Sequence, residues 1–196
     1  RLGEASHKHG SVIESVYIGG GTPTTLSADQ LKLLIERTAG SFHIDPSKIE
    51  FTVEAGRPDT ITEDKLKTLT SLGIDRISIN PQSMKDETLR LIGRDHSSKD
   101  IREGFRLAHE IGFNVINADL IAGLPEEDET VFSASLSEVI ALGAENITVH
   151  TLSVKKCSRL KENDPLYYRS NALAVSDTLD IARKTLTESG YRPYYI

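Results

Sequence analysis

Short apolar, β-branched stretches alternate along this chain with longer stretches that repeat apolar residues at helical spacing. The short stretches predict five β-strands, over residues 15–20, 49–55, 75–80, 115–123 and 146–153. Amphipathic stretches between them predict four helices, over residues 28–39, 62–72, 98–111 and 129–142. Because strands and helices alternate, we expect βαβ units with parallel strands and right-handed crossovers.

Residues at the ends of the predicted helices support this assignment. Ser27 precedes the first helix and Thr62 begins the second, where each side chain can accept a backbone N–H bond. Gly73, Gly112 and Gly143 each follow a helix and precede a strand. Glycine is common there because it readily adopts the left-handed conformation that ends many helices.

Each predicted strand ends in polar residues or glycines. These groups are GGGTP at 19–23, Glu54 with Arg57, Asn80 with Gln82, Asp119 with Gly123, and His150 with Thr151 and Ser153. A barrel of parallel strands carries its functional residues at the carboxyl ends of its strands. A doubly wound sheet would instead need a phosphate fingerprint early and a ribose-binding acid after its second strand. The pattern favours a partial α/β barrel, since five strands are too few to close a barrel of eight.

The pattern changes after residue 153. Residues 154–170 are polar and predict a long loop, residues 172–189 predict a further helix, and residues 191–196 predict the beginning of another strand. We expect residues 1–190 to form one barrel core that is truncated at its amino terminus. Residues 191–196 are expected to begin a C-terminal extension that is cut off.

Composition narrows the class of protein. The chain has 196 residues, with 23 Lys+Arg against 29 Asp+Glu and a formal net charge of −6. This acidic balance and the scattered basic residues argue against a nucleic-acid partner, and no apolar run reaches the roughly 20 residues that span a membrane. The one cysteine, Cys157, excludes a disulfide framework and a metal site built only from cysteines of this chain. A reducing, cytoplasmic setting is expected.

The GGGTP segment is the first candidate for ligand binding. Its three glycines leave backbone N–H and C=O groups open to a ligand. It is not a phosphate loop, because no Gly-Lys-Ser/Thr follows and Thr24 occupies the last glycine position of a GxGxxG motif. A tight strand-to-helix turn without a ligand is the alternative.

Three further polar residues have both a functional and a structural interpretation. Glu54 can bind an ammonium group or ribose hydroxyls, or it can simply pair with Arg57. Gln82 offers a donor and an acceptor to a sugar, or it serves as a turn residue. Arg94 can hold a carboxylate with two parallel bonds, or it can lie on a surface turn.

Asp119 and His150 stand on predicted strands. A buried acid needs a partner, so Asp119 either pairs structurally or points into a site, and the second is favoured. His150 is a base or a ligand, or a hydrogen-bonded core residue. No Ser-His-Asp or Cys-His arrangement and no HxxxH spacing is apparent. The residues alone therefore indicate a cofactor or substrate site across the strand ends, with no catalytic residue or metal ligand assigned.

Five segments, taken in order, resemble the radical S-adenosylmethionine (SAM) enzymes. They are VYIGGGTPTTL, FTVEAGRPDTIT, RISINPQSMKDETLRLIGR, INADLIAGLP and ITVHTLSVKKCSRL. The chain is most similar to the oxygen-independent coproporphyrinogen III oxidase family, the HemN/HemZ/HemW group. The segments AGRPDT, INPQS and VHTLS resemble its HemZ-type branch in particular.

The resemblance implies a TIM-like (β/α)6 partial barrel whose first strand lies upstream of this chain. It also implies a CxxxCxxC loop after that strand, which holds a 4Fe–4S cluster. The motif is absent from this sequence, and Cys157 cannot replace three thiolates. The chain alone is therefore expected to carry neither the cluster nor radical activity.

The resemblance further implies a SAM site. Gly20, Gly21 and Thr22 match the loop that receives the methionyl amino group. Glu54 matches an acid that contacts SAM, and Arg94 matches the partner of the SAM carboxylate. Opposite charges at these positions suit the zwitterionic end of the molecule.

Other matching positions correspond to the nucleoside end of SAM. Gln82 and Asp119 resemble residues that reach the ribose and its neighbourhood. Ile121 and Gly123 match an apolar segment beside adenine, and Ser153 matches a further backbone contact. Polar groups suit the hydroxyls, and an apolar surface suits the base.

For the intact protein, the resemblance implies oxidative decarboxylation of coproporphyrinogen III in haem biosynthesis. An electron donor and the cluster would reduce SAM to a 5′-deoxyadenosyl radical, which would take hydrogen from propionate side chains to leave vinyl groups and CO2. Arg57, Lys155 and Lys156 are candidates for propionate binding. Two alternatives stay open: a haem-trafficking SAM-binding protein of the same superfamily, and a non-redox nucleotide-binding barrel module.

Overall fold

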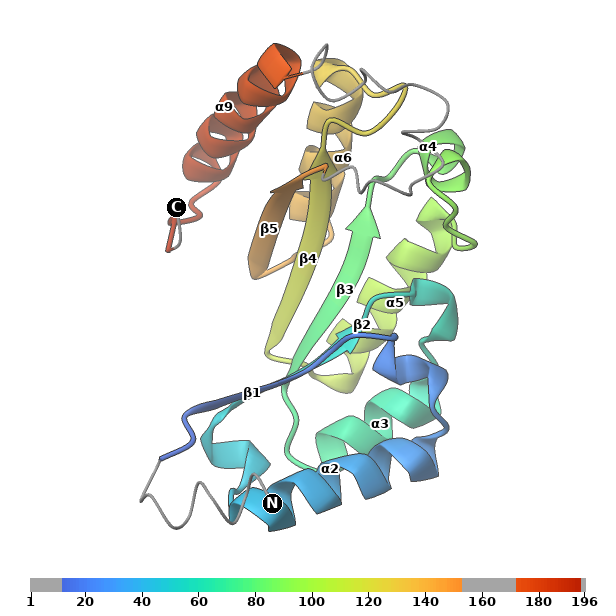
Figure 1. Cartoon of the computed structure of the whole chain (residues 1–196), viewed down its shortest axis with the longest axis vertical. Helices are drawn as coiled ribbons and strands as arrows, with labels where there is room; N and C mark the ends of the chain where they lie inside the picture. The colour runs from blue at the N-terminus through green and yellow to red at the C-terminus, as the bar shows by residue number, and fades with distance from the viewer. Residues whose placement is uncertain (1–11, 153–171, 195–196) are drawn as a thin grey trace.

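A computed structural model describes residues 12–152 and 172–194. Its strands are β1 (Ser15–Ile18), β2 (Glu50–Ala55), β3 (Arg76–Gln82), β4 (Val115–Ala122) and β5 (Asn146–Thr151). They form one sheet in the order β1-β2-β3-β4-β5, and every neighbouring pair is parallel. The sheet curls into a half-barrel with helices along its outer face (Figure 1). The predicted partial barrel of parallel strands is confirmed.

The described helices follow the predicted order. They are α2 (Ala28–Phe42), α3 (Glu63–Ser71), α4 (Asp86–Leu91), α5 (Ser98–Ile111), α6 (Glu129–Ala141) and α9 (Ala172–Glu188), with short 3-10 helices η1 (Pro23–Thr25), η2 (Pro46–Lys48) and η3 (Pro58–Thr60). Helix α2 runs beyond its predicted end, because His43 rather than Gly40 adopts the left-handed conformation that ends it. Within the residues described, no helix is both long and apolar enough to cross a membrane.

The predicted helix ends are confirmed in detail. Ser27 Oγ accepts from Gln30 N at 3.2 Å, and Gln30 Oε1 accepts from Ser27 N at 3.0 Å, so two backbone donors at the start of α2 are satisfied. Gly73, Gly112 and Gly143 have φ angles of 82°, 96° and 80°. These left-handed turns redirect the chain from each helix into the next strand.

The alternation of residues along β4 separates the two faces of the sheet. Every second side chain, from Ile116 to Ala122, is fully buried, and the residues between them are only partly buried. The buried set packs with Phe51 and Val53 of β2 and Phe105 of α5 in one core cluster. The core therefore lies between the sheet and the outer helices, and the intervening positions face the concave side.

The prediction that a strand begins at residue 191 is wrong for the described residues of this segment, because residues 191–194 adopt no strand. Tyr191 N donates to Leu186 O at 2.9 Å at the end of α9. Tyr194 Oη accepts from Asn146 Nδ2 at 3.2 Å. These bonds attach the segment through individual contacts instead of a backbone ladder. The loop predicted over 154–170 lies outside the described residues.

Candidate functional site

Polar side chains form a continuous hydrogen-bonded series across the concave face, which we call the polar series. It begins at the loop after β1, where Gly20 N donates to Glu54 Oε2 at 2.9 Å. The other oxygen, Glu54 Oε1, accepts from Asn80 Nδ2 at 3.2 Å. Asn80 Oδ1 in turn accepts from Ser78 Oγ at 2.8 Å. Both oxygens of Glu54 are bonded, so its carboxylate has one fixed orientation.

The polar series continues onto β4 and β5 through Asn117. Asn117 Nδ2 donates to Ser78 Oγ and to Asp119 Oδ1, both at 2.8 Å. Asn117 Oδ1 accepts from Thr148 Oγ1 at 3.2 Å. The parallel register explains these contacts, because Ser78 pairs with Asn117 and Asp119 pairs with Thr148. Asp119 is held through Oδ1, which leaves Oδ2 to accept from a further donor.

Glycines on both sides make room for the Glu54 carboxylate. A Cβ atom at Gly19 would lie 2.7 Å from Glu54 Oε2, and one at Gly56 would lie 2.7 Å from Glu54 Oε1. A side chain at either position would therefore displace the carboxylate. Apart from the neighbouring residues in the chain, no atom of the described residues lies within 4 Å of the Cβ positions of Gly20 and Gly21. The tip of the glycine loop is open on that side, as a binding loop requires.

Thr22 ends the glycine loop in an uncommon backbone conformation. Its φ angle is 55°, in the left-handed region that residues with a side chain rarely adopt. Two bonds support it, because Thr25 N and Thr25 Oγ1 donate to Thr22 O at 3.0 and 2.8 Å. Strained backbone of this kind is frequent at binding sites, where the surrounding structure holds it in place.

Arg94 is a partly buried guanidinium near this carboxylate. Burial and the charge of Arg57 lower its pKa, while Glu54 acts in the opposite direction. Among the described residues, no side chain pairs with Arg94. Arg57 pairs with Asp95 at 2.9 Å and with Asp59 at 3.4 Å. The Glu54–Arg57 pair considered above is thus not formed, and the Arg94 guanidinium is available to an anion.

The other predicted contacts lie at the ends of β3 and β4. Gln82 is 7% exposed, with a φ of 68°, where the register between β3 and β4 shifts. Ile121 faces the concave side. A Cβ atom at Gly123 would lie 2.5 Å from Val175 Cγ2, so close packing of α9 also accounts for this glycine. Ser153 lies outside the described residues.

Three members of the polar series, Ser78, Asn117 and Thr148, were not predicted from the sequence, and Asn80 was noted only as a strand end. Each of the first two stands two positions before another polar residue, Asn80 or Asp119, in an otherwise apolar strand. Residues two apart in a strand share a face. Polar pairs at this spacing were the signal that could have revealed them.

Tyr17 of β1 also reaches the polar series. Partial burial and the carboxylates of Glu54 and Asp119 raise the pKa of its phenol, while a hydrogen-bond contact with the Ser78 hydroxyl acts in the opposite direction. The ring lies against Gly19, whose Cβ position is 2.4 Å from Tyr17 Cε1. The side chain thus closes the β1 end of the concave face. Nothing in its sequence context distinguished it from a packing tyrosine.

Side chains that can bind a metal do not gather in the region that the structure describes. Within residues 12–152 and 172–194, no group of three or more His, Cys, Asp or Glu side chains is arranged to hold a metal ion. His150 is exposed on β5, so it is not the buried core residue considered above. Cys157 lies outside the described residues. The described side chains therefore do not fit an iron–sulfur cluster.

His96 is a buried imidazole two positions after Arg94. It is 3% exposed, its Nε2 lies 3.5 Å from Pro81 O, and its Nδ1 has no hydrogen-bond partner. Nε2 is therefore assigned the proton. Burial lowers the pKa of His96, and the charge of Arg94 lowers it further. The hydrogen bond to Pro81 and the carboxylates of Asp59 and Asp100 oppose this shift.

We expect His96 to make the protein less stable as the pH falls from about 7.5 to 5.5. The unfolded side chain binds a proton near its ordinary pKa of about 6.5, whereas the folded one resists protonation until a lower pH. Each pH unit by which folding lowers the pKa of His96 corresponds to about 1.4 kcal/mol of unfolding free energy lost. Urea unfolding of wild type and His96→Gln, measured between about pH 7.5 and 5.5, tests this prediction. The wild type should lose more stability than the variant, and parallel curves would contradict the prediction.

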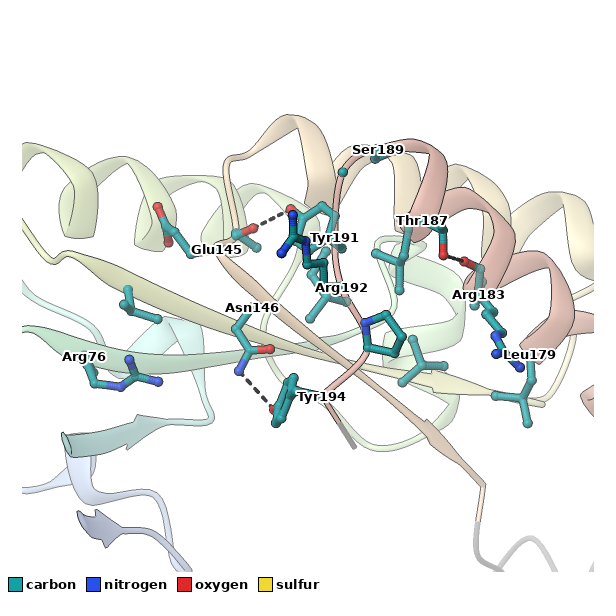
Figure 2. A pocket seen from close by; sticks show the side chains of 18 of the residues that line it. Arg76, Glu145, Asn146, Leu179, Arg183, Thr187, Ser189, Tyr191, Arg192 and Tyr194 are labelled. Atoms are coloured by element: carbon teal, nitrogen blue, oxygen red, sulfur yellow. Dashed lines mark hydrogen bonds between the residues drawn. The ribbon is translucent and has the colours of Figure 1, made fainter. Parts of the chain in front are cut away.

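A cavity of about 980 Å³ lies away from the polar series (Figure 2). It opens between β5, α9 and residues 189–194, and Arg76, Asn146 and Arg183 are among its lining side chains. Arg76 and Asn146 begin their strands, so this cavity is at the amino-terminal end of the barrel. Functional residues of parallel barrels gather at the opposite end. We therefore assign the candidate site to the polar series and the glycine loop.

Fold and site together define a parallel α/β partial barrel with a polar ligand site at the carboxyl ends of its strands. The sequence profile of the radical SAM superfamily matches residues 1–139. The HemZ protein of Bacillus subtilis, named as oxygen-independent coproporphyrinogen-III oxidase-like, is 45% identical over 196 residues. The chain therefore belongs to the radical SAM superfamily, in the group of the HemN, HemZ and HemW proteins.

Further relatives carry two different names. The heme chaperone HemW of Bacillus subtilis is 38% identical over 143 residues, which are 73% of this chain and 38% of that protein. The solved structure of coproporphyrinogen III oxidase (HemN) from Escherichia coli, a radical SAM enzyme, matches with a TM-score of 0.77 and 26% identity, over 97% of this chain and 44% of that one. The match to HemZ covers all of this chain but 39% of HemZ. The chain thus spans less than half the length of these relatives.

Proposed function

We propose that this part of the barrel binds SAM along its concave face in the full-length gene product. The observation that carries the proposal is the arrangement around Glu54: a carboxylate fixed by Gly20 and Asn80, an open glycine loop, and the partly buried guanidinium of Arg94, with which no side chain of the described residues pairs. SAM carries an ammonium group and a carboxylate at one end. A fixed anion and an available cation suit these two groups.

The methionyl end is assigned to five residues. Backbone oxygens of Gly20 and Gly21 and the hydroxyl of Thr22 would accept from the ammonium group. Glu54 would keep the loop in place through Gly20 N and attract the positive charge. Arg94 would hold the carboxylate with two parallel bonds.

The nucleoside end is assigned to the strand ends of β3, β4 and β5. Gln82 and Asp119 would bond to the ribose hydroxyls, with Asp119 using the oxygen that Asn117 leaves free. Ile121 and Gly123 would lie against adenine, and Ser153 would supply a further backbone contact. An apolar strand surface suits the base, because its faces carry little charge.

A 4Fe–4S cluster, when bound, supplies the electron for reductive cleavage of SAM. The described side chains offer no ligand set for it. We propose that cysteines upstream of this chain hold the cluster, as the CxxxCxxC motif of the family implies. The residues of this chain would bind SAM, orient it and exclude water from it.

We further propose that the full-length gene product decarboxylates propionate side chains of coproporphyrinogen III in the cytoplasm. Each propionate would give one hydrogen atom to the 5′-deoxyadenosyl radical and one electron to an electron acceptor, and would lose CO2 to become a vinyl group. An electron donor would restore the cluster. The names of the HemZ and HemN relatives support this assignment. A haem-trafficking role is the second candidate, supported by the identity to HemW.

The test uses the gene product purified without oxygen and reconstituted with iron and sulfide. SAM binding, 5′-deoxyadenosine formation and porphyrin products are measured with and without coproporphyrinogen III. Substrate-stimulated 5′-deoxyadenosine together with vinyl products is the expected result. SAM and haem binding without porphyrin conversion would support the chaperone role. Failure to bind SAM would overturn both.

A further inference from the structure

Lys65 joins two loops of the candidate site, and no motif in the sequence points to it. It lies in the first turn of α3, outside the concave face. Its Nζ donates to Thr24 O at 2.6 Å and to Thr60 O at 3.0 Å. Thr24 follows the glycine loop after β1, and Thr60 follows the Glu54–Arg57 segment after β2. One ammonium group therefore connects the two loops that we assign to the methionyl end of SAM.

The hydroxyl groups of the same two threonines complete this connection. Thr24 Oγ1 and Thr60 Oγ1 lie 2.6 Å apart. Thr60 Oγ1 donates its proton to Arg57 O at 2.7 Å, so Thr24 must donate to Thr60. Thr24 is fully buried. Without Lys65, its carbonyl would lose a charged donor in a place that water does not reach easily, which is costly.

The outer part of the glycine loop has little other support. In the part of the chain that the structure describes, nothing packs against the Cβ positions of Gly20 and Gly21. The loop is attached on one side by the bond from Gly20 N to Glu54. On the other side it is attached through Thr24 to Lys65. The position of the loop relative to the Glu54 carboxylate therefore depends on Gly20 at one end and, at the other, on Thr24, which is held by Lys65 and by the Thr60 hydroxyl.

We propose that Lys65 is a positioning residue for SAM, which sets the glycine loop at its binding distance from Glu54. This inference rests on the proposed SAM site. A pre-ordered loop binds without first losing conformational freedom, so its release should weaken binding although Lys65 does not touch the ligand. The Lys65→Met variant keeps the length and apolar stem of the side chain and removes the ammonium.

The test compares wild type, Lys65→Met and Lys67→Met in the reconstituted full-length gene product. Lys67 lies on the same helix, is exposed, and pairs with Glu63 at 2.5 Å, so it is a matched control. We expect the dissociation constant for SAM to rise about tenfold in Lys65→Met and to stay unchanged in Lys67→Met. Amide hydrogen exchange should quicken in residues 19–25 of Lys65→Met and stay as in wild type in β3 and β4.

The outcomes distinguish a failure of the proposed SAM site from a failure of the proposed positioning role of Lys65. If wild type does not bind SAM, the proposed function fails, and the exchange experiment still decides whether Lys65 orders the loop. If wild type and Lys65→Met bind SAM equally, the positioning role is wrong. Faster exchange throughout the barrel would also overturn it, because that result indicates a general stabilising role. Should Lys65→Met not fold, Lys65→Gln replaces it, with a smaller increase in the dissociation constant expected.

Discussion

Replacing Glu54 by glutamine weakens SAM binding by roughly 10- to 100-fold, the expected loss for hydrogen bonds to a charged group. Both oxygens of Glu54 accept from N–H donors, Gly20 N and Asn80 Nδ2. A glutamine has only one oxygen, so its NH2 group must face one of these donors without a bond. The negative charge that we propose beside the SAM ammonium group is lost as well. Titration calorimetry with SAM on the reconstituted gene product measures the change.

The matched control for this prediction is Glu50→Gln. Glu50 lies on the same strand at the other end, is exposed, and pairs with Arg76 only at 3.7 Å. Its replacement should leave the SAM affinity unchanged, because exposed pairs of this kind contribute little. Equal affinities of wild type and Glu54→Gln would remove Glu54 from the site. Equal losses in both variants would indicate a long-range charge effect instead.

Replacing Phe105 by alanine has the largest expected effect on stability. Phe105 is fully buried on α5 and belongs to the core cluster between the sheet and the outer helices. Its removal leaves a cavity that a close-packed core cannot refill, which costs about 3–5 kcal/mol of unfolding free energy. Urea unfolding followed by circular dichroism on the full-length gene product measures this loss.

Leu33→Ala provides the comparison for the core variant. Leu33 is 51% exposed on α2, so its removal creates no internal cavity. Its effect should stay within about 0.5 kcal/mol of wild type. Similar losses for Phe105→Ala and Leu33→Ala would mean that the interface between α5 and the sheet is not the principal core.

Strand and helix assignments came from signals that lie close together along the chain. Alternating apolar residues in β4, the cap at Ser27 and the left-handed Gly112 each need only neighbouring residues to form. Polar residues at the strand ends indicated the edge of the barrel at which the candidate site lies, because the carboxyl ends of parallel strands meet there. These features were predictable since the physics behind them is local.

The partners of each site residue were not predictable in this way. The sequence left open whether Glu54 binds a ligand or pairs with Arg57, three positions away, whereas it is bonded by residues 34 and 26 positions away. No sequence pattern pointed to Lys65 or His96. The contacts of Lys65 and the burial of His96 arise where segments distant in sequence meet in the folded barrel. The same holds for residues 191–194, whose β-like composition did not produce a strand. Spacing along the chain thus determined the barrel and the edge that carries the candidate site, whereas packing of distant segments selected which side chains meet there.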